Sequence, residues 1–275
     1  MTRDRVEHRA RLRRWEFDLI ASALSEVLPN EQTGRLRVLE FGCGAHSCAE
    51  YLSQFGALTV TDTHRDPSLS LPPGVEFEIA DIHCTKFRSN EFDVLVASHV
   101  LPCLADLNKA FAEMRRIGKE DAYYAFSVPT STWLVLSIPA KLFKRLGNVF
   151  DRIKAAFTRQ DNASVIESVR SSVKNSGHIE RSLLRRFTLG GVWYYTSFSE
   201  ALRALRIKNW RHILLSNGFR IIKEVPLLTY ADSDIPIIPP VRFAARLGMA
   251  SSYLFICRQK DDKYRERIYE GRISR

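Results

Sequence analysis

Two glycines and two aspartates stand where the chain could hold a nucleoside. Gly42 and Gly44 follow Glu40 closely, and a glycine lets a ligand rest against the backbone because no Cβ intervenes. Asp62 comes about 20 residues later, the distance at which a carboxylate can accept from both ribose hydroxyls of an adenosine. Asp81-Ile82 offers an acceptor for an adenine amino group beside an apolar side chain for the ring. Together these positions predict a nucleoside-binding crevice.

Strand ends are needed to bring these residues together. Apolar runs predict strands at Arg37–Phe41, Leu58–Thr61, Val75–Ile79, Phe92–Ala97, Ala122–Val128, Phe219–Val225 and Ser252–Cys257. Helical spacing predicts helices over Arg5–Leu28, from near Ser47, over Asp106–Ile117 and over Lys208–Asn217. Strands that alternate with helices predict an α/β fold with a doubly wound, mostly parallel sheet. In such a sheet the three acidic residues, Glu40, Asp62 and Asp81, meet at one edge.

The order and spacing of these motifs resemble the class I S-adenosylmethionine-dependent methyltransferases, which have a Rossmann-like fold. The resemblance rests on Val38–Gly44, Asp62, Asp81-Ile82 and Phe92–Leu101, and it covers Arg37 to about Pro129. It implies a seven-stranded sheet whose last strand, Ser252–Cys257, is antiparallel to the rest. It also implies S-adenosyl-L-methionine as cofactor, held by Glu40, Gly42, Gly44, Asp62, Asp81, Ile82 and Ser98.

Two other interpretations of the glycine turn are weaker. A nicotinamide-dependent dehydrogenase would carry a third glycine where this chain has Ser47, and no Tyr-x-x-x-Lys pair of the short-chain reductases occurs. A plain strand-to-helix corner would not explain the acids at the following strand ends. One departure from the resembled family is His46, which stands where a further glycine is common. A cofactor without a phosphate tolerates fewer glycines.

The predicted reaction moves a methyl group to an oxygen of a small-molecule or glycan-type acceptor, which could be phosphorylated or lipid-linked. His99 is the first candidate for a catalytic base, because it follows the fourth strand and imidazole exchanges protons near neutral pH. His178 with Glu180 is a second candidate, and Trp193–Tyr195 could line the acceptor pocket. Ordinary structural roles remain open for all of them. The alternatives are an RNA-directed methyltransferase and a cofactor-binding module without transfer activity.

The charge of the chain favours an anionic partner. The formal net charge is +10, which suits a phosphorylated acceptor, an acidic membrane surface or nucleic acid. Base methylation of nucleic acid is disfavoured, because Ser98–Leu101 stands where such enzymes resemble Asn/Asp-Pro-Pro-Tyr. Apolar residues over Trp133–Phe143, beside Lys141, Lys144 and Arg145, could rest on an anionic membrane. An amphipathic helix packed on the sheet is the structural alternative.

Cysteine usage and segment polarity favour the cytoplasm. The five cysteines form no C-x-x-C pair, so neither a disulfide framework nor a metal site is expected. The polar N-terminus does not look like a secretory signal, and the longest uncharged stretch, Ala122–Ala140, contains two prolines. We expect a cytoplasmic protein without a transmembrane segment, with peripheral contact at the inner membrane surface as an option.

The chain divides into five expected parts. They are an N-terminal amphipathic helix (1–30), a cofactor-binding core (31–130), a helical insertion acting as a lid (131–202), the C-terminal part of the core sheet (203–258) and a disordered tail (259–275). The insertion is assigned because the alternation of strands and helices stops there. The tail is assigned because its charges are mixed and it contains no apolar pattern.

Overall fold

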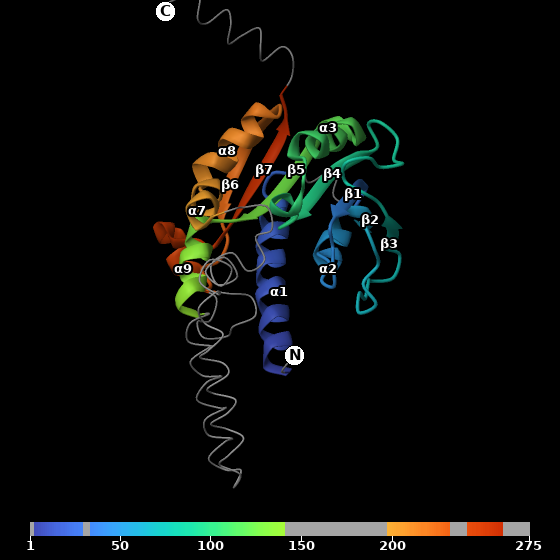
Figure 1. Ribbon diagram of the computed structural model, residues 1–275. Helices are drawn as coiled ribbons and strands as arrows, with labels where there is room; N and C mark the ends of the chain where they lie inside the picture. Colours follow the sequence, from blue (N-terminus) through green and yellow to red (C-terminus); the bar gives the residue numbers. More distant parts are fainter. Residues whose placement is uncertain (1–2, 30–33, 141–196, 232–240, 261–275) are drawn as a thin grey trace, which may run out of the picture.

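A single open sheet of seven strands organises the computed structural model, which describes residues 3–29, 34–140, 197–231 and 241–260 (Figure 1). The strands are β1 (Leu36–Phe41), β2 (Gly56–Asp62), β3 (Glu76–Ile79), β4 (Phe92–Ser98), β5 (Gly118–Pro129), β6 (Phe219–Pro226) and β7 (Ser252–Gln259). Their order is β3-β2-β1-β4-β5-β7-β6, and β7 is antiparallel to both of its neighbours. The seven-stranded, mostly parallel α/β sheet predicted from the sequence is therefore confirmed, including its antiparallel last strand.

Helices flank the sheet on both faces. They are α1 (Arg3–Ser25), α2 (Ala49–Leu52), α3 (Leu107–Ile117), α7 (Phe198–Ala204), α8 (Ile207–Ser216) and α9 (Arg242–Ala244). Two short 3₁₀ helices are η2 (Ser53–Phe55) and η3 (Leu101–Cys103), and η5 (Ala245–Met249) is a short π-helical segment. Residues 131–140 are also helical. The helix expected from near Ser47 is only the four-residue α2, which η2 continues up to the first residue of β2.

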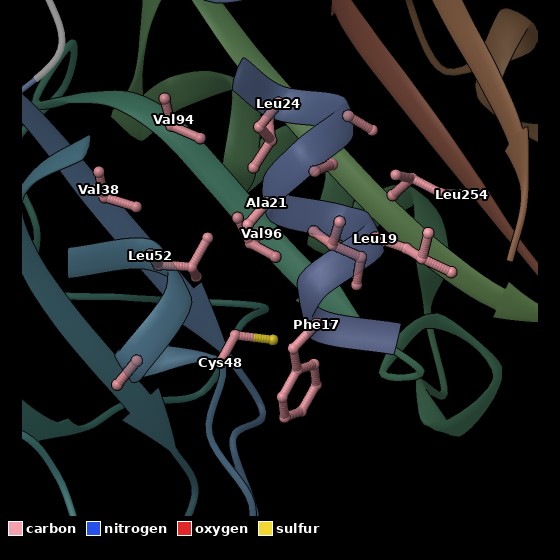
Figure 2. Close-up of a cluster of buried hydrophobic side chains, with 14 of the residues drawn as sticks. Phe17, Leu19, Ala21, Leu24, Val38, Cys48, Leu52, Val94, Val96 and Leu254 are labelled. Atoms are coloured by element: carbon pink, nitrogen blue, oxygen red, sulfur yellow. The ribbon is translucent and has the colours of Figure 1, made fainter. Parts of the chain in front are cut away.

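Alternate side chains of β4 build two separate cores. Val94 and Val96 pack with α1 and α2, whereas Leu95 and Ala97 pack with α3 and α8 on the opposite face, as the two-residue period of a strand requires. Figure 2 shows the first core, where Ala21 and Leu24 of α1 gather with Val94, Val96 and Leu52. The core on this face of the sheet thus depends on α1, a helix that precedes the first strand.

The strand order reverses between β1 and β4. From β1 the chain proceeds outward to β2 and β3, and then returns to place β4 on the other side of β1. In open α/β sheets a crevice forms at the carboxyl ends of the strands at such a switch point. Because β7 is antiparallel, its first residue, Ser252, pairs with Pro129 at the carboxyl end of β5 and lies at this same edge.

The structure bears on three predictions about the parts of the chain. Gln259 was assigned to the tail but ends β7, because its side-chain amide donates to the Tyr124 hydroxyl at 2.7 Å. In the stretch expected to rest on a membrane, Leu134 is fully buried and Trp133 packs against both cores, so this part of the helix is built into the fold. The lid remains a prediction, since residues 141–196 lie outside the described part, as do residues 261–275 of the tail.

No helix in the described ranges combines the length and the apolar character that crossing a bilayer would demand.

Candidate functional site

A pocket of about 400 Å³ opens at the carboxyl ends of β1, β2 and β4. Its wall includes residues from the glycine turn after β1, from the loops after β2 and β3, and from the turn after β4. The lining residues of interest are Gly42, Asp62, Asp81, Ile82, His83 and His99. Five of these six were predicted as site residues from the sequence, and the fold brings them together at the switch point.

The turn after β1 needs glycine for two different reasons. Gly42 has φ 66° and Gly44 has φ 54°, in the left-handed region that residues with a side chain rarely adopt. At Gly42 a Cβ would also come within 2.4 Å of Val100 Cγ2, while at Gly44 nothing lies within 4 Å. The turn is fixed to β2, since the Gly42 N–H donates to the Thr61 carbonyl at 2.8 Å. Gly42 therefore lets Val100, which also lines the pocket, pack directly against the turn.

Glu40 supports this turn from the protein interior. Its side chain is buried, and its carboxylate accepts from the Ser47 hydroxyl and, at 2.8 Å, from the Cys48 N–H. Burial raises the pKa of Glu40 to about 7, although these two hydrogen bonds lower it. Glu40 does not line the pocket. The structure thus gives it a positioning contact between β1 and the start of α2, and leaves its predicted contact with a ligand untested.

Asp62 is held by the backbone on both of its oxygens. One oxygen accepts from the Gly44 N–H at 2.8 Å and the other from the Thr63 N–H at 2.7 Å. The side chain is 15% exposed and lines the pocket. A carboxylate offers about four acceptor positions, so Asp62 can accept further hydrogen bonds from hydroxyls placed in the pocket.

Asp81 and His83 form a second polar pair in the wall. Asp81 Oδ1 accepts from the His83 N–H at 2.9 Å and lies 2.7 Å from His83 Nδ1, and these contacts lower the Asp81 pKa, the backbone bond most. His83 Nε2 is buried and makes no hydrogen bond to any described residue. Buried polar atoms are nearly always paired, so this nitrogen points to a missing partner. Between the two lies Ile82, which is buried and apolar.

Ser98 does not lie in the pocket wall. Its hydroxyl is 2.9 Å from the Ser127 hydroxyl, a contact that joins β4 to β5 below the site. The next residue, His99, has φ 58°, an unusual conformation for a residue with a side chain. The His99 N–H donates to the Ser127 carbonyl at 2.9 Å, which helps to hold this turn. This strained residue directly follows β4 and is one of those that line the pocket.

The His99 ring meets a buried carboxylate from α1. His99 Nε2 lies 3.3 Å from Glu16 Oε1, and the Glu16 side chain is fully buried. The same oxygen accepts from the Ser252 hydroxyl at 2.5 Å and from the Tyr230 hydroxyl at 3.4 Å, while Arg13 Nη1 donates to the other oxygen at 3.0 Å. Burial raises the pKa of Glu16, but His99, Arg13 and Ser252 outweigh it and lower the value to about 2. Glu16 is therefore ionised.

Sequence reasoning missed Glu16 and His83. A signal for Glu16 was present, because it stands four residues after Leu12 and four before Ile20, on the buried stripe of an amphipathic helix. A charged residue on such a stripe needs a buried partner. His83 follows Asp81 by two residues, the spacing at which an aspartate accepts from a backbone N–H. The candidates His178, Glu180 and Trp193–Tyr195 lie outside the described residues.

The comparisons with known proteins give one family match and a set of distant structural neighbours. A family model described as a methyltransferase domain matches residues 12–224. Comparison with curated proteins finds no match. Among solved structures, the chain is similar to a SAM-dependent methyltransferase from Aquifex aeolicus, at 13% identity and TM-score 0.47, covering 89% of this chain and 91% of that one. It is also similar to an S-adenosylmethionine-dependent methyltransferase from Mesorhizobium loti, at 16% identity and TM-score 0.48, covering 86% and 96%.

Proposed function

The chain belongs to the methyltransferase domain family, with S-adenosylmethionine as its cofactor, and we propose that it methylates an oxygen of a small-molecule or glycan-type acceptor. His99 acts as the general base in this proposal, and Glu16 orients it. One observation carries the proposal: an ionised, buried carboxylate holds a histidine in the wall of the pocket. An oxygen acceptor is favoured because a hydroxyl is a weak nucleophile until its proton is removed.

The pocket fits the cofactor by the chemistry of its wall. Gly42 brings the glycine turn into the pocket wall, and Asp62 has acceptor capacity left for ribose hydroxyls. Asp81, whose side chain is exposed, can accept from the amino group of the adenine, and Ile82 can pack on the face of the ring. When bound, S-adenosylmethionine supplies a methyl group on a sulfonium centre. The chain's own task is to hold the acceptor nearby and to keep water out.

Glu16 determines which nitrogen of His99 acts as the base. With Nε2–H donating to the ionised carboxylate, the neutral ring carries its lone pair on Nδ1. Nδ1 can then take the proton of an acceptor hydroxyl, which makes that oxygen nucleophilic. The imidazolium that results is stabilised by the charge of Glu16. Ser252, Tyr230 and Arg13 keep Glu16 in place while His99 changes its charge.

A basic region beside the site supports an anionic acceptor. Arg9 and Arg13 are one helical turn apart on α1, and the charges of both lower the pKa of His46 in the glycine turn. The pKa of His46 is lowered by burial first and then by Arg13 and Arg9, although Asp66 raises it, so the two arginines add positive charge to the environment of the glycine turn. A phosphate or carboxylate on the acceptor would be attracted to that environment.

Label transfer tests the acceptor atom and the base together. The full chain is incubated with methyl-labelled cofactor and fractionated cell extract, and the labelled product is treated with hydriodic acid, which releases methyl groups from oxygen as methyl iodide. We expect volatile label, and we expect His99→Ala to lower the rate about 100-fold or more. His212→Ala, an exposed histidine on α8, is the matched control and should keep full activity. Label retained on carbon, or an active His99→Ala, would contradict the proposal.

The charge of the acceptor is tested in the same fractions. We expect label to enter material that binds an anion exchanger, and treatment with nuclease should leave it intact. Arg9→Glu should raise KM for the acceptor while the affinity for S-adenosylmethionine stays the same. Label that enters RNA, or a neutral acceptor whose KM does not respond to Arg9→Glu, would overturn this part of the proposal.

A further inference from the structure

A short loop before β7 exposes apolar side chains beside arginines. We call residues 241–249 the basic–apolar loop; it comprises α9 and η5. Phe243 is 71% exposed, Leu247 63% and Met249 49%, far more than folded proteins usually allow large apolar side chains of one segment. Arg242 and Arg246 are exposed in the same loop, which contains no acidic residue.

The loop is held firmly, so its exposure is a property of the fold. Thr229 anchors both ends: its backbone exchanges hydrogen bonds with Val241 at 3.0 and 2.9 Å, and its hydroxyl donates to the Met249 carbonyl at 2.7 Å. Between these ends Ala245 is 1% exposed and fixes the middle of the loop to the interior. Phe243 and Leu247 are thus both exposed to solvent on a segment that is anchored at its two ends and in its middle.

The loop also lies at the edge of the sheet that holds the pocket. It leads directly into β7, whose first residue, Ser252, pairs with Pro129 at the carboxyl end of β5. The Ser252 hydroxyl donates to Glu16, the partner of His99. Figure 1 shows α9 at the periphery of the described fold. A flat surface that meets the loop would therefore face the same edge as the pocket.

We propose that the basic–apolar loop binds the surface of an anionic lipid bilayer. Apolar side chains that project outward can enter the boundary between headgroups and acyl chains, and flanking arginines can pair with lipid phosphates. The net charge of +10 adds long-range attraction to the same surface. A rigid protein partner would need a groove for the loop, whereas a bilayer accommodates a projecting side chain by itself. This inference is independent of the proposed acceptor.

Vesicle co-sedimentation of the full chain tests the proposal. One set of vesicles is phosphatidylcholine alone, and the other contains equal parts of phosphatidylcholine and phosphatidylglycerol. We expect binding to the anionic set only, with a loss of about tenfold or more in partitioning for Phe243→Asp/Leu247→Asp. Leu215→Asp, at a 43% exposed leucine on α8, is the apolar control and should bind as the wild type does. Circular dichroism verifies that every variant is folded.

Charge variants separate a local site from general attraction. Arg242→Glu/Arg246→Glu should abolish binding, whereas Arg35→Glu/Arg220→Glu changes the net charge equally at the amino ends of β1 and β6, the opposite edge of the sheet, and should retain most of it. Equal loss in the two double variants would overturn the proposal, as would equal binding to both kinds of vesicle. The proposal would also be overturned if the wild type did not bind vesicles and Phe243→Asp changed only the oligomeric state. That result would assign the loop to contact with a second copy of the chain.

Discussion

Glu16 and His99 are separated by 83 positions in the chain, yet Glu16 Oε1 lies 3.3 Å from His99 Nε2. The contact exists because α1 packs across one face of the sheet and brings a carboxylate to the turn after β4. The helix that precedes the first strand therefore contributes to the site as directly as the strand ends do. It also links the site to β7 through Ser252.

Glu16→Gln should lower kcat with little effect on cofactor affinity. The amide keeps the shape of the side chain but loses the charge that stabilises a protonated His99. We therefore expect kcat to fall about 10- to 100-fold, a fraction of the rate enhancement that a positioned base usually contributes. Isothermal titration with S-adenosylmethionine should give nearly the wild-type Kd. Ser252→Ala, which removes one hydroxyl donor to Glu16 and leaves its charge in place, is the matched control and should reduce kcat less. Equal kcat in wild type and Glu16→Gln would show that the charge of Glu16 does not assist His99.

The same substitution should change the response to acid. The pKa of Glu16 falls from its ordinary 4.5 to about 2 on folding, so its stabilising contribution is complete above pH 4.5 and is lost as the pH falls toward 2. Wild type should therefore lose free energy of unfolding across this window more steeply than Glu16→Gln. Urea denaturation at several pH values measures the two slopes. Parallel slopes would show that folding does not lower the pKa of Glu16.

Glu40→Gln should show the opposite dependence on pH. Burial raises the pKa of Glu40 from 4.5 to about 7, so the contribution of this carboxyl to stability is complete below pH 4.5 and is lost as the pH rises through 7. A glutamine does not titrate. Relative to wild type, the variant should gain up to about 3 kcal/mol between these limits, measured by denaturation without ligand. A difference that stays constant over the window would contradict the raised pKa.

Asp62→Ala should weaken the binding of S-adenosylmethionine. The loss of a hydrogen-bonded charged acceptor costs about 1 to 3 kcal/mol, or roughly 5- to 150-fold in Kd. Asp62 also accepts from the Gly44 N–H, so Asp62→Asn, which keeps one acceptor oxygen, shows how much of the effect is local folding. Isothermal titration measures both variants. An unchanged Kd for Asp62→Ala would remove the assignment.

The two glycines of the turn should respond differently to alanine. At Gly44 only the positive φ opposes a side chain, and we expect a cost of about 1 kcal/mol. At Gly42 the new Cβ also collides with Val100, so Gly42→Ala should cost more and weaken cofactor binding. In a Val100→Ala background the cost of Gly42→Ala should approach that of Gly44→Ala. Urea denaturation compares the wild type with the three single variants and the Gly42→Ala/Val100→Ala double variant, and equal costs for Gly42→Ala and Gly44→Ala would contradict the packing argument.

The sequence predicted the strands and the pocket well because both depend on local patterns. Apolar runs mark β1, β2 and β4, and the residue after each strand end is placed at the switch point by topology alone. The contact between Glu16 and His99 could not be predicted in the same way, since it depends on how α1 docks on the sheet. The hydrogen bonds of Glu40 to Ser47 and Cys48 were not predicted either, since the motif at the strand end indicates a position near the ligand and says nothing of internal partners. The exposure of Phe243 depends likewise on the anchoring by Thr229.

A crystal structure with S-adenosylhomocysteine, the demethylated product of the cofactor, tests the central claim most directly. We predict that the compound occupies the pocket with its ribose hydroxyls on Asp62, its adenine between Ile82 and the turn after β4, and its sulfur on the side of His99. His99 should keep its contact with Glu16. A compound bound elsewhere, or a pocket closed by its own side chains in that crystal, would contradict the account.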